Sequence, residues 1–153
     1  MNINKIKSTF GYVGFLPFAL FAICPWVFGG NIGITSIYFQ IAYGSIILSF
    51  LGGMAWGWRD DQPSQAYNLS IGIIYSLVGC LSLILMFFDQ VLASLLILMI
   101  AFQSFYYFER STVDFQKRDD EYKDFRKMLS LLVSISFLLS SAYWINPYSN
   151  LLI

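Results

Sequence analysis

Long apolar stretches separated by short polar segments dominate this sequence. Five stretches contain no Asp, Glu, Lys or Arg: residues 10–28, 34–58, 67–88, 91–108 and 128–145. A helix of about 20 apolar residues crosses the hydrocarbon core of a bilayer, because each residue adds about 1.5 Å to its length. The pattern therefore predicts an all-α polytopic membrane protein with five transmembrane helices in a single transmembrane domain.

The polar segments between these stretches predict the connections. Residues 29–31, Gly-Gly-Asn, are typical of a tight turn, and residues 59–64 form a polar loop that contains a proline. Only Asp89 and Gln90 separate the third stretch from the fourth. So short a connection requires a tight antiparallel hairpin.

The segment 109–127 is the only long hydrophilic one, with six acidic and six basic residues. Asp114 and Arg118, and likewise Asp119 and Lys123, are oppositely charged pairs four residues apart, a spacing that stabilises a solvated helix. Apolar residues in and just after the segment fall on one helical face: Phe115, Tyr122, Phe125 and Leu129. We therefore expect a charged helix or loop that lies on the membrane surface or extends the last span.

Composition and charge agree with a membrane protein. Of the residues, 58% are hydrophobic and 12% are charged, whereas about a quarter are charged in soluble proteins. Nine basic residues balance nine acidic ones, so no general basic surface is available for nucleic acid. All nine Lys and Arg lie before the first stretch, in the loop 59–64, or in the segment 109–127. Because basic residues gather on the cytoplasmic side, we expect the N-terminus inside and the C-terminus outside.

Small residues line one face of the second stretch. At a spacing of four lie Ser45, Ser49, Gly53 and Gly57, with Gly44 and Gly52 beside them. Such a strip lets two helix backbones approach closely, which is how helices associate in lipid. The third stretch carries a comparable strip at Gly72, Ser76 and Cys80, and we expect it to be the first partner. The second stretch thus predicts helix packing, within the chain or between chains.

Side chains that carry out reactions are scarce. The sequence contains no histidine, the commonest neutral-pH acid, base and metal ligand. None of the five stretches contains an Asp, Glu, Lys or Arg that would mark a proton or ion path. Two cysteines are too few for a zinc or iron–sulfur site. We therefore expect a protein that is not an enzyme, with no catalytic residues, no metal and no cofactor.

Two groups of polar or amphipathic residues remain as candidates. Gln40 and Gln103 lie well inside the stretches, where they either bridge helices or line a polar path, and bridging is the more frequent role. Trp56, Trp58 and Arg59 lie at the end of the second stretch. These three fit an interfacial lipid contact, since amphipathic rings anchor helices at the boundary and Arg pairs with phosphate. In the same interpretation, the two aspartates that follow hold a divalent cation. The alternative is an interfacial anchor followed by a solvated loop.

The second stretch also resembles a known family. Residues 43–44, 48–53 and 56–57 (Tyr-Gly, Leu-Ser-Phe-Leu-Gly-Gly and Trp-Gly) are similar to the signature of small membrane proteins of unknown function that include transmembrane protein 69. The resemblance implies a five-span protein of a bacterial inner membrane or of the mitochondrial inner membrane. It implies no activity for individual residues.

Three functions are compatible with these observations. The first is a non-catalytic accessory or assembly component that packs through the small residues of the second stretch, as a homo-oligomer or with a membrane-protein partner. The second is an oligomeric channel or carrier for a neutral or weakly polar solute, lined by Gln40 and Gln103. The third is a lipid- or quinone-binding protein that uses aromatic residues near the charged side of the membrane.

Overall fold

The computed structural model describes residues 3–57 and 62–146, and side chains within 5–57 and 65–146. Throughout these ranges the chain is helical apart from short turns. The elements are α1 (Ile3–Phe28), α2 (Gly30–Met54), the short 3₁₀ helix η1 (Ala55–Gly57), α3 (Gln62–Phe87), α4 (Val91–Ser111), α5 (Val113–Gln116) and α6 (Asp120–Ile145).

Five of these helices, α1, α2, α3, α4 and α6, are long and apolar enough to cross a membrane. The prediction of an all-α chain with five spans is therefore confirmed. The helices nevertheless extend beyond the apolar stretches: α4 continues to Ser111 and α6 already begins at Asp120. The charged segment 109–127 is thus not one separate helix. It divides into the end of α4, the single turn α5, and the start of α6.

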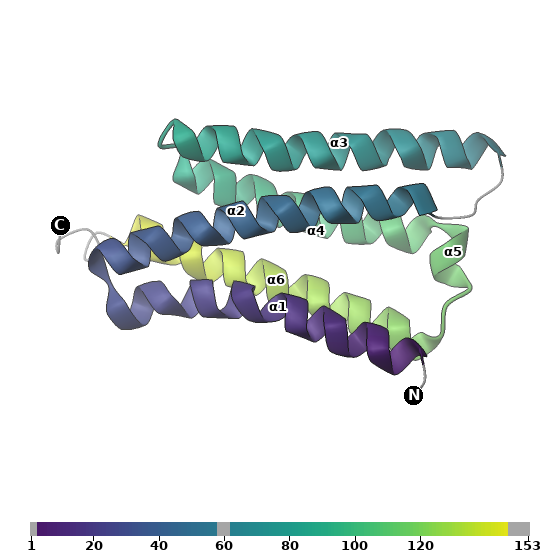
Figure 1. Cartoon of the computed structure of the whole chain (residues 1–153), viewed down its shortest axis with the longest axis horizontal. Coiled ribbons are helices and arrows are strands. Elements are labelled where there is room, and N and C mark those ends of the chain that lie inside the picture. The colour runs from purple at the N-terminus through teal and green to yellow at the C-terminus, as the bar shows by residue number, and fades with distance from the viewer. Residues whose placement is uncertain (1–2, 58–61, 147–153) are drawn as a thin grey trace.

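The helices form an up-and-down bundle (Figure 1). Helix α2 packs against α1, α3 and α4, while α6 packs against α1 and α4. One end of the bundle, which we call the charged end, contains the start of α1, the end of α2, the start of α3, the end of α4, α5 and the start of α6. The opposite end contains the turns from α1 to α2 and from α3 to α4.

Two tight turns close the opposite end. Gly29 and Gly30 have φ angles of 60° and 51°, in the left-handed region that glycine adopts at little cost. Their conformation reverses the chain between α1 and α2. Between α3 and α4, the Ser94 hydroxyl donates to the Ser82 carbonyl at 2.8 Å, and Ser82 donates back to Ser94 at 3.3 Å. The hairpin predicted from Asp89 and Gln90 is present.

The core of the bundle is aromatic. The Phe18 ring is 2% exposed and meets the rings of Tyr43, Phe102 and Phe137 edge to face, at centroid distances of 5.0 to 5.7 Å. These four rings come from α1, α2, α4 and α6, so one cluster joins four of the long helices. Many large apolar side chains point outward instead, as expected for helices that face lipid rather than water.

Candidate functional site

The small residues of α2 make a close contact with α3. A Cβ atom on Gly52 would collide with the carbonyl oxygen of Gly72, and the reverse collision also holds. Seven residues further along α3, which is about two helical turns, a Cβ atom on Gly79 would lie 2.8 Å from the Ser45 carbonyl oxygen and 3.0 Å from the Ser49 hydroxyl. The two backbones therefore approach one another without intervening side chains.

The register of this contact differs from the spacing of four expected from the sequence. Gly53 and Gly57 are exposed, and a Cβ atom on either would have no neighbour within 4 Å. Gly44 faces away from α3, with its Cβ position 2.8 Å from Phe137 and 3.3 Å from Leu98. Each step of four residues turns a helix by about 400°, so the strip drifts by about 40° per step. Contacts between two helices instead repeat about every seven residues, as Ser45 and Gly52 do.

Both glutamines bridge helices to α6, Gln40 in a buried position and Gln103 in a half-buried one. Gln40 is fully buried; its amide nitrogen lies 3.4 Å from the Ser136 hydroxyl, and its amide oxygen accepts a hydrogen bond from Ser140. The amide nitrogen of Gln103 donates to the Ser134 hydroxyl at 2.6 Å and also approaches a carbonyl of α6. These amides engage Ser134, Ser136 and Ser140 of α6.

Trp56, in η1, is the described member of the expected interfacial group, and its side chain is 57% exposed. Trp58 and Arg59 lie outside the described residues, as do Asp60 and Asp61, so the contact and cation interpretations of this loop remain predictions.

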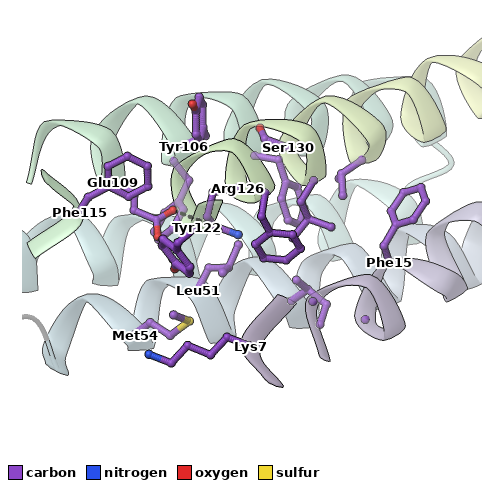
Figure 2. Close-up of a pocket in the computed structure, with 18 of the residues that line it drawn as sticks. Lys7, Phe15, Leu51, Met54, Tyr106, Glu109, Phe115, Tyr122, Arg126 and Ser130 are labelled. Atoms are coloured by element: carbon purple, nitrogen blue, oxygen red, sulfur yellow. Dashed lines mark hydrogen bonds and ion pairs between the residues drawn. The ribbon is translucent and has the colours of Figure 1, made fainter. Parts of the chain in front are cut away.

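A cavity of about 430 Å³ lies at the charged end, between α1, α2, α4, α5 and α6 (Figure 2). Its lining is mostly apolar and aromatic, and includes Phe10, Phe15, Phe18, Phe50, Phe115 and Phe125. Two glycines of α1 shape it. A Cβ atom on Gly11 would collide with the Phe125 ring, whereas a Cβ atom on Gly14 would have only the Tyr43 hydroxyl within reach, at 4.0 Å. The volume falls in the range of about 300 to 1,000 Å³ that is usual for small-molecule sites.

A buried ion pair forms the polar part of the cavity. The Arg126 guanidinium donates to Glu109 Oε2 through Nε at 2.9 Å and through Nη2. The Tyr122 hydroxyl donates to the other carboxylate oxygen at 3.4 Å. The side chains of Arg126 and Glu109 are only 12% and 4% exposed, and Figure 2 shows them beside Tyr122. Two charges removed from water need such a pairing, because either one alone would be costly to bury.

The sequence interpretation missed this pair. It assigned Glu109 and Arg126 to a solvated segment because each lies just beyond an apolar stretch. The positions of Glu109 and Arg126 in the sequence nonetheless indicate that they could meet. The two residues lie near opposite ends of the hydrophilic segment 109–127, at nearly equal distances from its middle, so a hairpin centred on this segment would bring them to the same level. Opposite charges at matching positions of a hairpin therefore predict such a bridge.

The rim of the cavity carries a second ion pair. Arg118 donates to Asp114 at 2.9 Å, and both side chains are about one-third exposed. The hydrogen bond that Arg118 donates to Asp114 raises the pKa of Arg118, which keeps the guanidinium charged. Lys123 lies 3.3 Å from Asp120, and the expected pair of Asp119 with Lys123 stays a prediction. Helix α6 begins at Asp120, which places Asp119 in the cap position.

Thr112 fixes the turn that closes the charged end. Its hydroxyl donates to the Glu109 carbonyl at 2.7 Å and accepts from the Phe115 amide at 3.3 Å. This N-cap of α5 holds Phe115 against the cavity.

In the described ranges, no group of three or more metal-ligating side chains occurs.

Fold and site together define a polytopic helical membrane protein with an amphipathic cavity at one end of its bundle. Residues 3–142 match the family model described as "Protein of unknown function (DUF3429)", so the chain belongs to that family. Comparison with curated proteins gave no match. Comparison with solved structures likewise gave none.

Proposed function

We propose that this membrane protein binds an amphiphilic small molecule, a membrane lipid or a quinone-like compound, in the cavity at the charged end. The observation that carries the proposal is one continuous lining that is apolar over most of its surface, rich in aromatic rings, and charged at one side. Ligand sites in proteins combine an apolar lining with a few placed polar groups in this way. The protein needs no catalytic group for such a role, and we propose that it is not an enzyme.

The order of the lining matches the order of groups in an amphiphile. Phe18 and Val133 lie toward the middle of the bundle, while Glu109, Arg126 and Tyr122 lie toward the charged end. A ligand aligned with the bundle would place its apolar part against the rings and its polar group beside the ion pair. The buried guanidinium can donate its remaining N–H groups to that group, and the Tyr122 oxygen, whose proton goes to Glu109, can accept.

The cavity borders the lipid-facing surface between α1 and α2. Phe10 on α1 and Phe50 on α2 both line it, yet they are 71% and 64% exposed. Side chains that belong both to a cavity and to the outer surface mark its opening. We propose that the ligand enters between these two rings from the bilayer, without passing through water.

The proposal is tested by identifying what the purified protein retains. Native mass spectrometry after gentle detergent extraction should show the chain with a bound lipid or quinone. Gly14→Leu should abolish retention, because its side chain would enter the cavity at a position with free space. Gly53→Leu is the matched control, since Gly53 is exposed and does not line the cavity. Loss of ligand in neither variant, or an empty wild-type protein, would overturn the proposal.

A second candidate function keeps the accessory or assembly role. A Cβ atom on Gly53 or Gly57 would meet no atom within 4 Å among the residues that the structure describes, and Gly53 borders a shallow groove with Trp56, Ile73 and Leu77. A homo-oligomer or a membrane-protein partner would use this outer face, because Ser45, Ser49 and Gly52 are already occupied by α3. Gly53→Leu would then lower the mass of the detergent-solubilised complex, and an unchanged mass would remove this candidate.

The channel or carrier has less support. Gln40 and Gln103, which would line its path, are engaged by the serines of α6. Purified protein in liposomes should therefore show no solute flux that Gln103→Leu alters.

The location and orientation are also part of the proposal. We propose a bacterial inner membrane, or the mitochondrial inner membrane in a eukaryote, with the N-terminus inside and the C-terminus outside. The concentration of basic residues at the charged end supports this orientation. The resemblance of the second span to proteins such as transmembrane protein 69 supports the choice of membrane.

A further inference from the structure

We infer that the ligand of the cavity is an anionic membrane phospholipid, with its phosphate beside Lys7 at the opening. This inference rests on the proposed function and narrows it from amphiphiles in general to one class.

The charges of the lining do not balance. Five ionisable side chains with a full charge contribute to it: Lys7, Arg118, Arg126, Glu109 and Asp114. Arg126 pairs with Glu109, and Arg118 pairs with Asp114. Lys7 forms no ion pair with any residue that the structure describes. The lining thus carries one cation more than it has anions, which favours a ligand with a negative charge.

Lys7 lies beside the position that the phosphate of a bound phospholipid would occupy. It comes one helical turn before Phe10 and Gly11, on the same face of α1, and all three line the cavity. Its side chain is exposed and lies at the edge of the cavity in Figure 2, as does Met54 of α2. Lysine side chains near the ends of membrane helices extend toward the headgroup region. The ammonium therefore meets the headgroup level, and the apolar lining begins directly below it.

Other ligand chemistries use this arrangement less fully. A neutral quinone would fill the aromatic lining but would gain no electrostatic attraction from Lys7. Inorganic phosphate would pair with Lys7 but would leave the apolar lining in contact with water. An anionic phospholipid places a charge beside Lys7 and an acyl chain against Phe10 and Phe50 at the same time.

The test is a competition for the full-length protein in detergent. Native mass spectrometry would follow binding of phosphatidylglycerol and phosphatidylcholine with identical acyl chains, offered at equal concentration, with ubiquinone and inorganic phosphate as separate arms. We expect phosphatidylglycerol to be retained preferentially. Lys7→Gln should reduce this preference about five-fold, which corresponds to about 1 kcal/mol for one basic residue next to an anionic lipid.

Lys5→Gln is the matched control, because Lys5 is exposed on the same helix and does not line the cavity. It should leave the preference unchanged, and equal melting temperatures of both variants would show that they fold. Equal retention of the two phospholipids, stronger retention of ubiquinone, or the same loss in both lysine variants would overturn the inference while the proposed function stands. Retention of no lipid and no quinone would overturn the proposed function itself.

Discussion

Gly52 of α2 and Gly72 of α3 face each other so closely that a Cβ atom on either would collide with the carbonyl oxygen of the other. The obstacle is backbone, which cannot rotate away as a side chain can. A close contact of this kind gains van der Waals energy along two helices, and in lipid such packing replaces the hydrophobic drive for association. The contact fixes the distance between α2 and α3.

Gly52→Ala should therefore destabilise the protein by about 1 to 3 kcal/mol, the usual cost of overpacking. The matched variant is Gly53→Ala, one residue further along the same helix, where a Cβ atom meets nothing within 4 Å. It should leave stability unchanged or raise it by up to about 1 kcal/mol, because alanine favours the helix over glycine. Thermal unfolding in detergent measures both. Equal effects of the two substitutions would show that the contact does not carry stability.

The sequence was sufficient to predict the number and order of the long helices, because each needs an uninterrupted apolar stretch. It was also sufficient to relate α2 to α3 through their small residues. It did not predict the register. Residues spaced by four, from Ser45 to Gly57, turn gradually around the helix and do not stay on one face. Which of them contact α3 depends on the tilt of both helices. That tilt is a property of the whole bundle.

The cavity and its ion pair could not be predicted for a different reason. A charged residue at the edge of an apolar stretch marks the end of a span equally well whether it is solvated or buried. Glu109 and Arg126 are buried because α4 and α6 continue past the apolar stretches and place the two side chains opposite one another. The aromatic residues of the charged segment, Phe115 and Phe125, were recognised as one face. That this face borders a cavity depends on where α1 and α2 lie.

Removal of one member of the buried pair should be costly. We expect Arg126→Met to destabilise the protein by about 3 to 5 kcal/mol, because the Glu109 carboxylate would remain buried without its partner. The double variant Glu109→Leu with Arg126→Met should recover most of the loss, since it leaves no unpaired charge. Thermal unfolding of the wild type, of the Glu109→Leu and Arg126→Met single variants and of the double variant measures the coupling free energy between Glu109 and Arg126.

The rim pair supplies the control for this cycle. Asp114 and Arg118 are about one-third exposed, so Asp114→Asn should cost only about 0.2 to 1 kcal/mol, as exposed ion pairs do. A single Arg126→Met variant as stable as Asp114→Asn would contradict a buried role for the pair.

The Gln40 bridge should also be measurable. In a fully buried position, Gln40→Leu would remove the acceptor of the Ser140 hydroxyl and one donor to Ser136, which still donates to the Val133 carbonyl. We expect a loss of about 1 to 3 kcal/mol in unfolding free energy, the usual cost of leaving buried polar groups without partners. Addition of Ser140→Ala should restore part of it. An unchanged melting temperature for Gln40→Leu would show that these contacts do not join α2 to α6.

The proposed orientation has a direct test. Asp120 is 95% exposed at the charged end, so Asp120→Cys, in a chain with Cys24→Ser and Cys80→Ser, gives one accessible thiol. A membrane-impermeant maleimide should label it in inverted membrane vesicles and not in intact cells. Labelling in intact cells would show that the charged end faces outward, which contradicts the proposed orientation.

The most direct test of the cavity as a ligand site is an experimental structure determined in a lipid bilayer. The account predicts an elongated density that begins beside Lys7, passes between Phe10 and Phe50, and ends near Phe18, with Arg126 still paired to Glu109. A space closed by the surrounding rings, or one that holds only ordered water, would contradict it.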